Sequence, residues 1–102
     1  MRTLHLTLKK KWYDMIASGE KKEEYRENKQ YWRTRLQRNS SLGMITKEFD
    51  VVVFKNGYSK NAPTIKVECK GVSTGKAKPE WSDNHQGEVF VIKLGNILTP
   101  QP

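Results

Sequence analysis

The sequence predicts an α+β fold in which a small, strongly bent β-sheet closes toward a barrel and two helices flank it. Helical periodicity is confined to about the first 40 residues, whereas the second half alternates or runs continuously apolar, as strands do. The four or five strands expected are too few for a two-layer sandwich, so a bent sheet covered by helices explains the pattern best. With 102 residues and a hydrophobic fraction of 35%, we expect one domain over residues 1–102 with one compact core.

The N-terminal segment changes its period at position 8. Residues 3–8 alternate between leucine and polar side chains, which predicts a half-buried strand. A helix should follow, and Gly19 supplies the left-handed residue that ends it just after Ser18. The apolar stripe of this helix consists of Leu8, Trp12, Met15 and Ile16. We therefore expect Trp12 to be a core residue.

A second, shorter helix is expected from about Asn28, which is a suitable N-cap, to about Arg38. Its inner stripe would hold Leu36 and either Tyr31 or Trp32. The pattern leaves open which of the two rings packs inward and which could stack on a base. The outer rim of the helix would carry Arg33, Arg35 and Arg38.

The rest of the chain is expected to be rich in strands. Residues 39–43 and 73–87 have loop composition, the latter with room for a short 3₁₀ segment around an isolated Trp81. Residues 99–102 should form a loose tail. Apolar or alternating runs predict strands at residues 49–54, which should be central to the sheet, at 64–72 and at 88–94.

The charge of the chain is unevenly distributed. The formal net charge is +8, from 19 basic and 11 acidic side chains, and residues 1–40 carry +6 of it, with 11 basic and 5 acidic side chains. All five arginines lie in the first 38 residues. Such a surface suits a polyanionic partner such as nucleic acid, because neutralised phosphates release counterions. A basic surface without a partner is the alternative.

The single cysteine, Cys69, excludes an intramolecular disulfide and indicates a reducing compartment. It lies on the apolar face of its strand, where it should be a small core residue. No apolar run has the length of a signal peptide or of a membrane-spanning helix. We therefore expect a cytoplasmic protein with no membrane partner, and a monomer.

The most informative segment is the charged stretch that begins at Gly19. If residues 22–27 are extended, Lys22, Glu24 and Arg26 share one face of a strand and Lys21 lies at its entrance. A carboxylate flanked by cations can accept from an exocyclic amine while the cations donate to a phosphate or a carbonyl. The same groups could perform acid–base chemistry if burial lowered the pKa of the lysine. A solvated strand with surface ion pairs remains the third interpretation.

Gly19, Lys21, Glu24 and Arg26 form the pattern G-x-K-x-x-E-x-R, which resembles the signature of the ASCH domain family, a branch of the PUA-like superfamily. The resemblance covers nearly the whole chain and is closest to small stand-alone ASCH proteins of bacteria, phages and mobile elements. It extends over LHLTLKKKWYDMIASGEKKEEYR, YWRTRL, FDVVVFKNGY and VFVIKLG.

This resemblance implies a PUA-like β-barrel with a cleft lined by the motif residues, and RNA or a modified nucleobase or nucleoside as ligand. Some related proteins are amidohydrolases that deacylate N4-acetylcytidine with a lysine, a threonine and a glutamate. The lysine corresponds to Lys21, whereas the threonine falls on Glu24, whose carboxylate replaces that hydroxyl poorly. Glu80 is a candidate for the glutamate of the later loop. The departure at Glu24 argues for binding over this hydrolase chemistry.

The leading hypothesis is thus an RNA- or modified-nucleotide-binding module with a basic cleft. Lys21 and Arg26 would hold phosphate or carbonyl oxygens, and Glu24 would accept from a base amine. The loop residues Lys55, Asn56 and Tyr58 would face the cleft or form an ordinary turn, and Trp81 would act as a stacking lid or cover the open end of the barrel. The phosphate track would be widened by Arg33, Arg35 and the lysines 9–11, Lys10 among them.

Two rival functions remain open. The first is a nucleoside or RNA hydrolase, either an amidohydrolase or a ribonuclease, with Lys21 and Glu24 as its catalytic residues. The second is a protein-interaction adaptor. No cofactor is expected, and the isolated His5 and His85 lack the ligand spacing of a metal site.

Overall fold

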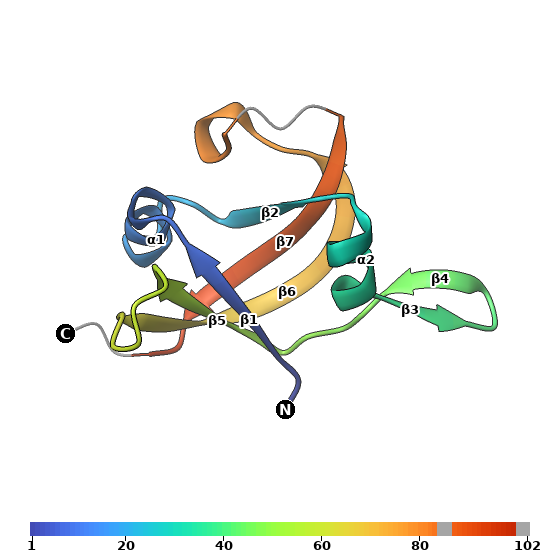
Figure 1. Cartoon of the computed structure of the whole chain (residues 1–102), viewed down its shortest axis with the longest axis horizontal. Helices are drawn as coiled ribbons and strands as arrows, with labels where there is room; N and C mark the ends of the chain where they lie inside the picture. Colours follow the sequence, from blue (N-terminus) through green and yellow to red (C-terminus); the bar gives the residue numbers. More distant parts are fainter. Residues whose placement is uncertain (84–86, 100–102) are drawn as a thin grey trace.

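The computed structural model describes residues 1–83 and 87–99. Within them, one five-stranded sheet has the strand order β1-β5-β6-β7-β2 and curls around the core (Figure 1). β1 pairs with β5 in parallel, and the other neighbours are antiparallel. The strands of this sheet are β1 (Thr3–Leu8), β2 (Glu23–Glu27), β5 (Val51–Asn56), β6 (Thr64–Lys76) and β7 (Glu88–Ile97).

Two helices and a separate hairpin complete the described fold. α1 (Lys10–Ala17) connects β1 to β2, which are the two edge strands of the curled sheet. α2 (Gln30–Leu36) leads into the hairpin of β3 (Gln37–Ser40) and β4 (Gly43–Thr46), and η1 (Pro79–Trp81) is a 3₁₀ turn between β6 and β7. The predicted α+β class, with a bent sheet and two helices, is confirmed.

The sheet bends where β6 is irregular. The register between β6 and β7 shifts on both sides of Cys69, and Gly71 has a φ of 145°, a conformation that side chains disfavour. Bulges of this kind increase strand twist and bend the strand. The curl brings the edge strands β1 and β2 toward each other, with α1 spanning one end (Figure 1).

The core fills the concave side of the sheet. Trp12 and Ile16 of α1, both buried as predicted, pack with Leu36 of α2 and with Phe54 and Phe90 of the central strands. Cys69 is buried in the same cluster, and burial raises the pKa of its thiol. In the described part of the chain, no helix is long and apolar enough to cross a membrane.

The helix starts differ from those predicted. α1 begins at Lys10 because Leu8 is still the last residue of β1, where it pairs with Asn56. Asn28 does not cap α2, which follows Lys29 without a side-chain cap. Instead, Asn28 Oδ1 accepts a hydrogen bond of 2.8 Å from Arg33 Nε.

The strands are more extensive than predicted. Most of the expected loop 39–43 belongs to the β3–β4 hairpin, so seven strands occur in residues 1–83 and 87–99 rather than four or five. Residues 73–76 continue β6 by pairing with β7, although their composition is polar. Thr99 is tied to Lys66 through its backbone and hydroxyl, whereas residues 100–102 of the expected tail lie outside the described residues.

Candidate ligand-binding cleft

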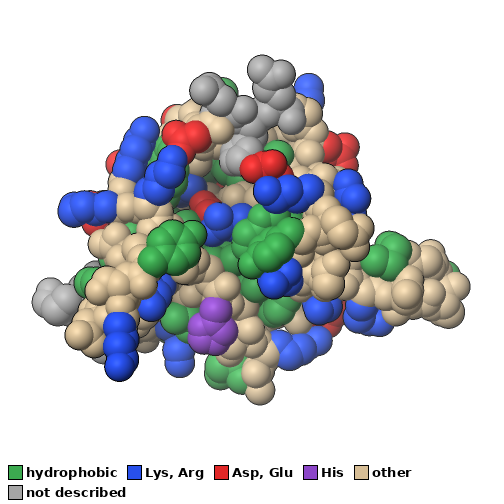
Figure 2. Space-filling model, in the orientation of Figure 1, with side chains coloured by type: hydrophobic (Ala, Val, Ile, Leu, Met, Phe, Trp, Pro, Cys, Tyr) green, Lys and Arg blue, Asp and Glu red, His purple; other side chains and the backbone are tan. Residues whose placement is uncertain are grey.

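A cleft of about 710 Å³ opens between the two edge strands of the sheet. Its walls come from the end of β1, the start of α1, β2, the first turn of α2, the loop after β5 and the segment that contains η1. In the space-filling view it is a hollow with charged side chains at its floor and apolar side chains beside it (Figure 2). Its volume lies within the range of roughly 300–1,000 Å³ that is typical of small-molecule sites.

The floor of the cleft is a buried ionic network of three residues. Lys21 Nζ donates to Glu24 Oε1 at 2.7 Å, and Arg26 Nη2 lies 3.0 Å from Glu24 Oε2. The side chains of Lys21, Glu24 and Arg26 are 1%, 5% and 19% exposed. Since two cations surround one carboxylate, the network carries a net charge of +1 in a site with little water.

The end of α1 places this network. Gly19 has a φ of 85°, which suits glycine, and it ends the helix so that Lys21 N can donate to Met15 O at 3.0 Å. β2 then runs extended, and its alternation puts Glu24 and Arg26 on one face. Lys22 is exposed and is absent from the cleft lining, so the shared face begins at Glu24. Burial of Lys21 and Glu24 is incompatible with a solvated charged strand.

Arg26 also connects the two edges of the sheet. Its Nη2 donates to the backbone carbonyl of Thr7 on β1 at 3.1 Å, while the guanidinium lies 5.0 Å from the ring centre of Trp32. Arg26 Nε is buried and has no hydrogen-bond partner among the described residues. The guanidinium therefore contacts Glu24 at the floor, the ring of Trp32 at one wall and β1 across the gap between the two edge strands, which we call the seam.

Burial lowers the pKa of Lys21. Loss of solvation is the largest cause, and the nearby charge of Arg26 acts in the same direction, whereas Glu24 opposes the shift through its charge and hydrogen bond. Lys21 Nζ also lies 4.3 Å from the ring centre of Trp12, which favours the charged form. Desolvation outweighs the contacts that favour the charged form, so the pKa of Lys21 is lowered overall.

The lowered pKa of Lys21 predicts how stability depends on pH. In the unfolded chain a lysine titrates near about pH 10.4. At a pH between the pKa of Lys21 in the folded protein and its pKa in the unfolded chain, the unfolded chain binds more protons than the folded protein. Raising the pH across that window therefore raises the free energy of unfolding. Lys21→Met lacks this gain. Urea unfolding at increasing pH should therefore favour the wild type over Lys21→Met progressively, and a difference independent of pH would contradict the shift.

The walls of the cleft are aromatic. All three tryptophans of the chain, Trp12, Trp32 and Trp81, line it, although they lie on three separate elements. Tyr58, which is 90% exposed, stands at its rim in the loop after β5. Tyr25 also lines the cleft. Its hydroxyl donates a hydrogen bond to Glu23, and burial raises the pKa of Tyr25. Such surfaces favour a flat ligand that can stack.

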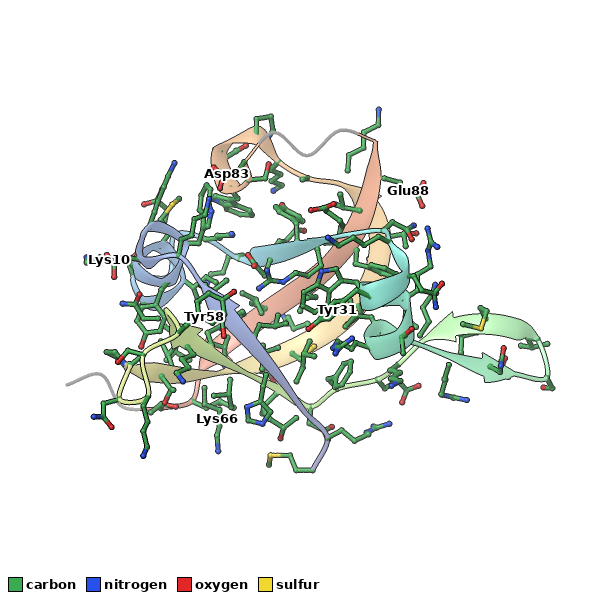
Figure 3. All side chains as sticks on the ribbon, viewed as in Figure 1. Lys10, Tyr31, Tyr58, Lys66, Asp83 and Glu88 are labelled. Carbon is green, nitrogen blue, oxygen red and sulfur yellow. The ribbon has the colours of Figure 1, made fainter. Side chains whose placement is uncertain are left out.

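One acidic residue of the rim ties two walls together. Asp83 Oδ2 accepts from Trp12 Nε1 at 3.2 Å and from Lys9 Nζ at 3.3 Å, so the segment after η1 is joined to α1. The hydrogen bond from Trp12, followed by that from Lys9, lowers the pKa of Asp83. Lys10, Tyr58 and Asp83 belong to the lining from three different segments, but the Lys10 side chain lies on the outer side of α1 (Figure 3), where its Nζ pairs with Asp14 at 2.6 Å.

Most of the residues predicted for the site meet at this cleft. Lys21, Glu24 and Arg26 form its floor, and the lining also includes Lys10, Asn56, Tyr58 and Trp81. Trp81 additionally packs against the small apolar cluster of Tyr25, Val89 and Val91, so it both lines the cleft and covers that end of the sheet.

Other predicted residues point elsewhere. Among the described residues that line the cleft, Arg33, Arg35 and Lys55 do not occur, nor does Glu80. Arg33 donates hydrogen bonds to Asn28, and the exposed Arg35 guanidinium lies 3.5 Å from the ring centre of Tyr31. His5 is exposed on β1, and His85 lies outside the described residues.

The cleft also contains residues that the sequence did not single out for it. Trp12 was expected only in the core, yet its ring forms a wall and its indole N–H binds Asp83. Trp32 is the inward ring of the Tyr31–Trp32 pair, and the ring of Tyr31 meets it edge-on at 4.9 Å. The carbonyl of Thr7 has no sequence signal at all, because every residue has one.

Comparison with known proteins finds no match to a family model, to a curated protein or to a solved structure.

Proposed function

We propose that the chain is a PUA-like module of the ASCH type that binds one nucleobase of an RNA, or a modified nucleoside or nucleotide, in the cleft. The observation that carries the proposal is the meeting of all three tryptophans with the Lys21–Glu24–Arg26 network around one volume of about 710 Å³. Aromatic walls hold a base by stacking, and a charged floor discriminates its polar edge. A cytoplasmic location and a monomeric state belong to the same proposal.

The floor favours a ligand with hydrogen-bond acceptors. Glu24 receives one cation on each carboxylate oxygen, so its main role is to orient Lys21 and Arg26. Lys21 has three N–H groups and commits one of them to Glu24, and Arg26 has five N–H groups, of which Nη2 serves Thr7 and Glu24. The remaining donors, apart from the buried Nε of Arg26, suit a base carbonyl with a neighbouring ring nitrogen, or a phosphate oxygen. Acceptance of a base amine by Glu24 becomes a secondary contact.

The test of this proposal uses Tyr58, which can be changed without disturbing the core because its side chain is 90% exposed. Loss of one stacking ring costs about 1–3 kcal/mol, so Tyr58→Ala should weaken binding by a factor of roughly 5 to 150. Nucleosides and short single-stranded RNAs can be titrated while tryptophan fluorescence is recorded, since all three tryptophans line the cleft.

Tyr58→Phe, which keeps the ring, should retain the affinity of the wild type. Leu98→Ala, at an exposed position just after β7 and outside the cleft lining, controls for general surface effects. If Tyr58→Ala binds as tightly as these two variants, stacking at the rim is ruled out. If no nucleoside or RNA changes the fluorescence, the proposed function is wrong.

A hydrolase acting on a nucleoside is a second candidate, and the lowered pKa of Lys21 favours it. A buried lysine with a depressed pKa is a better base at neutral pH than a solvated one. Acylated cytidines and RNA can be incubated with the wild type and with Lys21→Ala, and the products separated by chromatography. Product formation that disappears with Lys21→Ala would support the enzyme, whereas turnover that persists would exclude Lys21 as its base.

A further inference from the structure

Residues 28–47, which we call the basic arm, consist of α2 and the β3–β4 hairpin. They contain five basic side chains and no acidic one, so they carry +5 of the net charge of +8. The basic residues are Lys29, Arg33, Arg35, Arg38 and Lys47. Three of the five arginines of the chain therefore lie in one segment of 20 residues.

The hairpin of the basic arm projects from the body of the protein (Figure 1). It is anchored at its base, where Lys47 N donates to Leu36 O at 2.7 Å and Thr46 Oγ1 donates to Val72 O at 2.9 Å. Beyond this base its side chains face solvent, including Leu42, which is 90% exposed, and Met44, which is 55% exposed. A protrusion with so little contact to the core is not needed to cover it.

Two arginines of the basic arm, Arg33 and Arg35, are held by neutral groups. In residues 1–83 and 87–99, the ion pairs of the arm are limited to Lys29 with Glu27, at 3.8 Å. Arg33 donates to the side chain and carbonyl of Asn28, and Arg35 Nη1 donates to Tyr31 O at 3.1 Å. These contacts orient the guanidinium groups without neutralising them, so their charge and their other N–H groups stay available to a partner.

The basic arm is continuous with the cleft. Trp32 of α2 lines the cleft, and the ring of Tyr31, which lies on the side of α2 away from the hairpin (Figure 3), is 4.9 Å from the ring of Trp32 and 3.5 Å from the guanidinium of Arg35. Lys and Arg side chains lie around the cleft and along the lower edge of the view toward the projecting hairpin (Figure 2). An RNA strand with one base beside Trp32 would thus continue onto Tyr31 and the arginines of the basic arm.

We propose that the basic arm binds the phosphodiester backbone of a single-stranded RNA on one side of the nucleotide held in the cleft. The position of the RNA relative to the cleft rests on the proposed function, whereas binding of a polyanionic backbone by the basic arm does not. Planar guanidinium groups suit phosphate oxygens, and the ring of Tyr31, already stacked on Arg35, offers a face to a flanking base. Leu42 and Met44 would contact sugars or bases at the tip of the hairpin.

The test compares Arg35→Gln/Arg38→Gln with Lys66→Gln/Lys70→Gln, which removes the same charge from exposed positions of β6. The probes are a free nucleoside and twelve-residue oligouridylate and oligoadenylate, each titrated at several salt concentrations, and vesicles containing phosphatidylserine. Loss of two phosphate contacts reduces the salt slope of single-strand binding by about 1.4, which is about a twentyfold loss of affinity near 0.1 M salt. The control variant should keep the oligonucleotide affinity and slope of the wild type.

Neither Arg35 nor Arg38 belongs to the described lining of the cleft, so nucleoside affinity should not change in the arm variant. An unchanged oligonucleotide slope in that variant, with nucleoside binding intact, would overturn the role of the arm and leave the proposed function standing. Oligonucleotide binding that depends on the arm, without nucleoside binding, would support the arm and remove the cleft as a base site. Absence of binding to both probes would overturn both. If the arm variant lost binding only to vesicles containing phosphatidylserine, the partner of the basic arm would be a membrane surface and not RNA, which would overturn the proposal.

Discussion

Glu24→Gln should lower the free energy of unfolding by roughly 3 kcal/mol or more, because it leaves the buried ammonium of Lys21 without its counter-charge. Both partners are almost fully buried and their 2.7 Å contact is direct, so solvent compensates little for loss of the carboxylate charge. The substitution is nearly isosteric and keeps one acceptor oxygen, so loss of packing contributes little. Urea unfolding followed by tryptophan fluorescence measures the effect.

The same measurement on Lys21→Met/Glu24→Gln separates charge from shape. Removing the ammonium as well should restore part of the lost stability, since the amide oxygen can still accept from Arg26. Glu20→Gln, an exposed position one residue after Gly19, is the matched surface control. A loss in Glu24→Gln no greater than that in Glu20→Gln would show that the ionic network does not hold the floor.

Arg26→Lys should have the second-largest effect, although it conserves the charge. The guanidinium reaches Thr7 O at 3.1 Å, Glu24 Oε2 at 3.0 Å and the ring of Trp32 at the same time. An ammonium on a flexible stem cannot occupy these positions together. One lost charge-assisted hydrogen bond costs about 1.5–3 kcal/mol, and we expect a loss of stability in this range.

Amide hydrogen exchange distinguishes a local loosening of the seam in Arg26→Lys from a general loss of packing. Amides at the ends of β1 and β2 should exchange faster in Arg26→Lys than those of the central strands β5 and β6, because the seam between the two edges loosens. Arg38→Lys, at an exposed site on β3, should change neither stability nor exchange. Uniform acceleration over the whole sheet would contradict a specific role of Arg26 at the seam.

The parts of the fold that follow local periodicity could be predicted from the sequence. The stripe through Trp12 and Ile16 and the alternation of Ile65, Val67 and Cys69 identify faces that are indeed buried. The extent of the strands could not be predicted in this way. Thr74 is in β6 because it pairs with Phe90, and Asn39 is in β3 because it pairs with Met44. Such pairings depend on a partner strand and have no local signal in a polar segment.

The site residues also fall into those that local sequence predicts and those that only the tertiary fold brings together. Lys21, Glu24 and Arg26 are close in sequence, and an extended strand after Gly19 is sufficient to bring them together. Asp83 and Trp12 meet only after the sheet has curled, across 71 positions of the chain. Arg33 and Arg35 were expected beside the cleft because they are basic and near the motif. The helix turns Trp32 inward instead, so Trp32 lines the cleft, while Arg33 and Arg35 contact Asn28 and Tyr31.

The central claim is that the cleft takes a stacked nucleobase over the Lys21–Glu24–Arg26 floor, and the indole N–H resonances of the three tryptophans test it most directly. Titration of ¹⁵N-labelled protein with nucleosides and short RNAs should shift the signals of Trp12, Trp32 and Trp81, all of which line the cleft. The amides of Lys66 and Lys70 on β6 should stay in place. Binding of RNA that shifts the hairpin or β6 but leaves all three indoles unmoved would contradict the account.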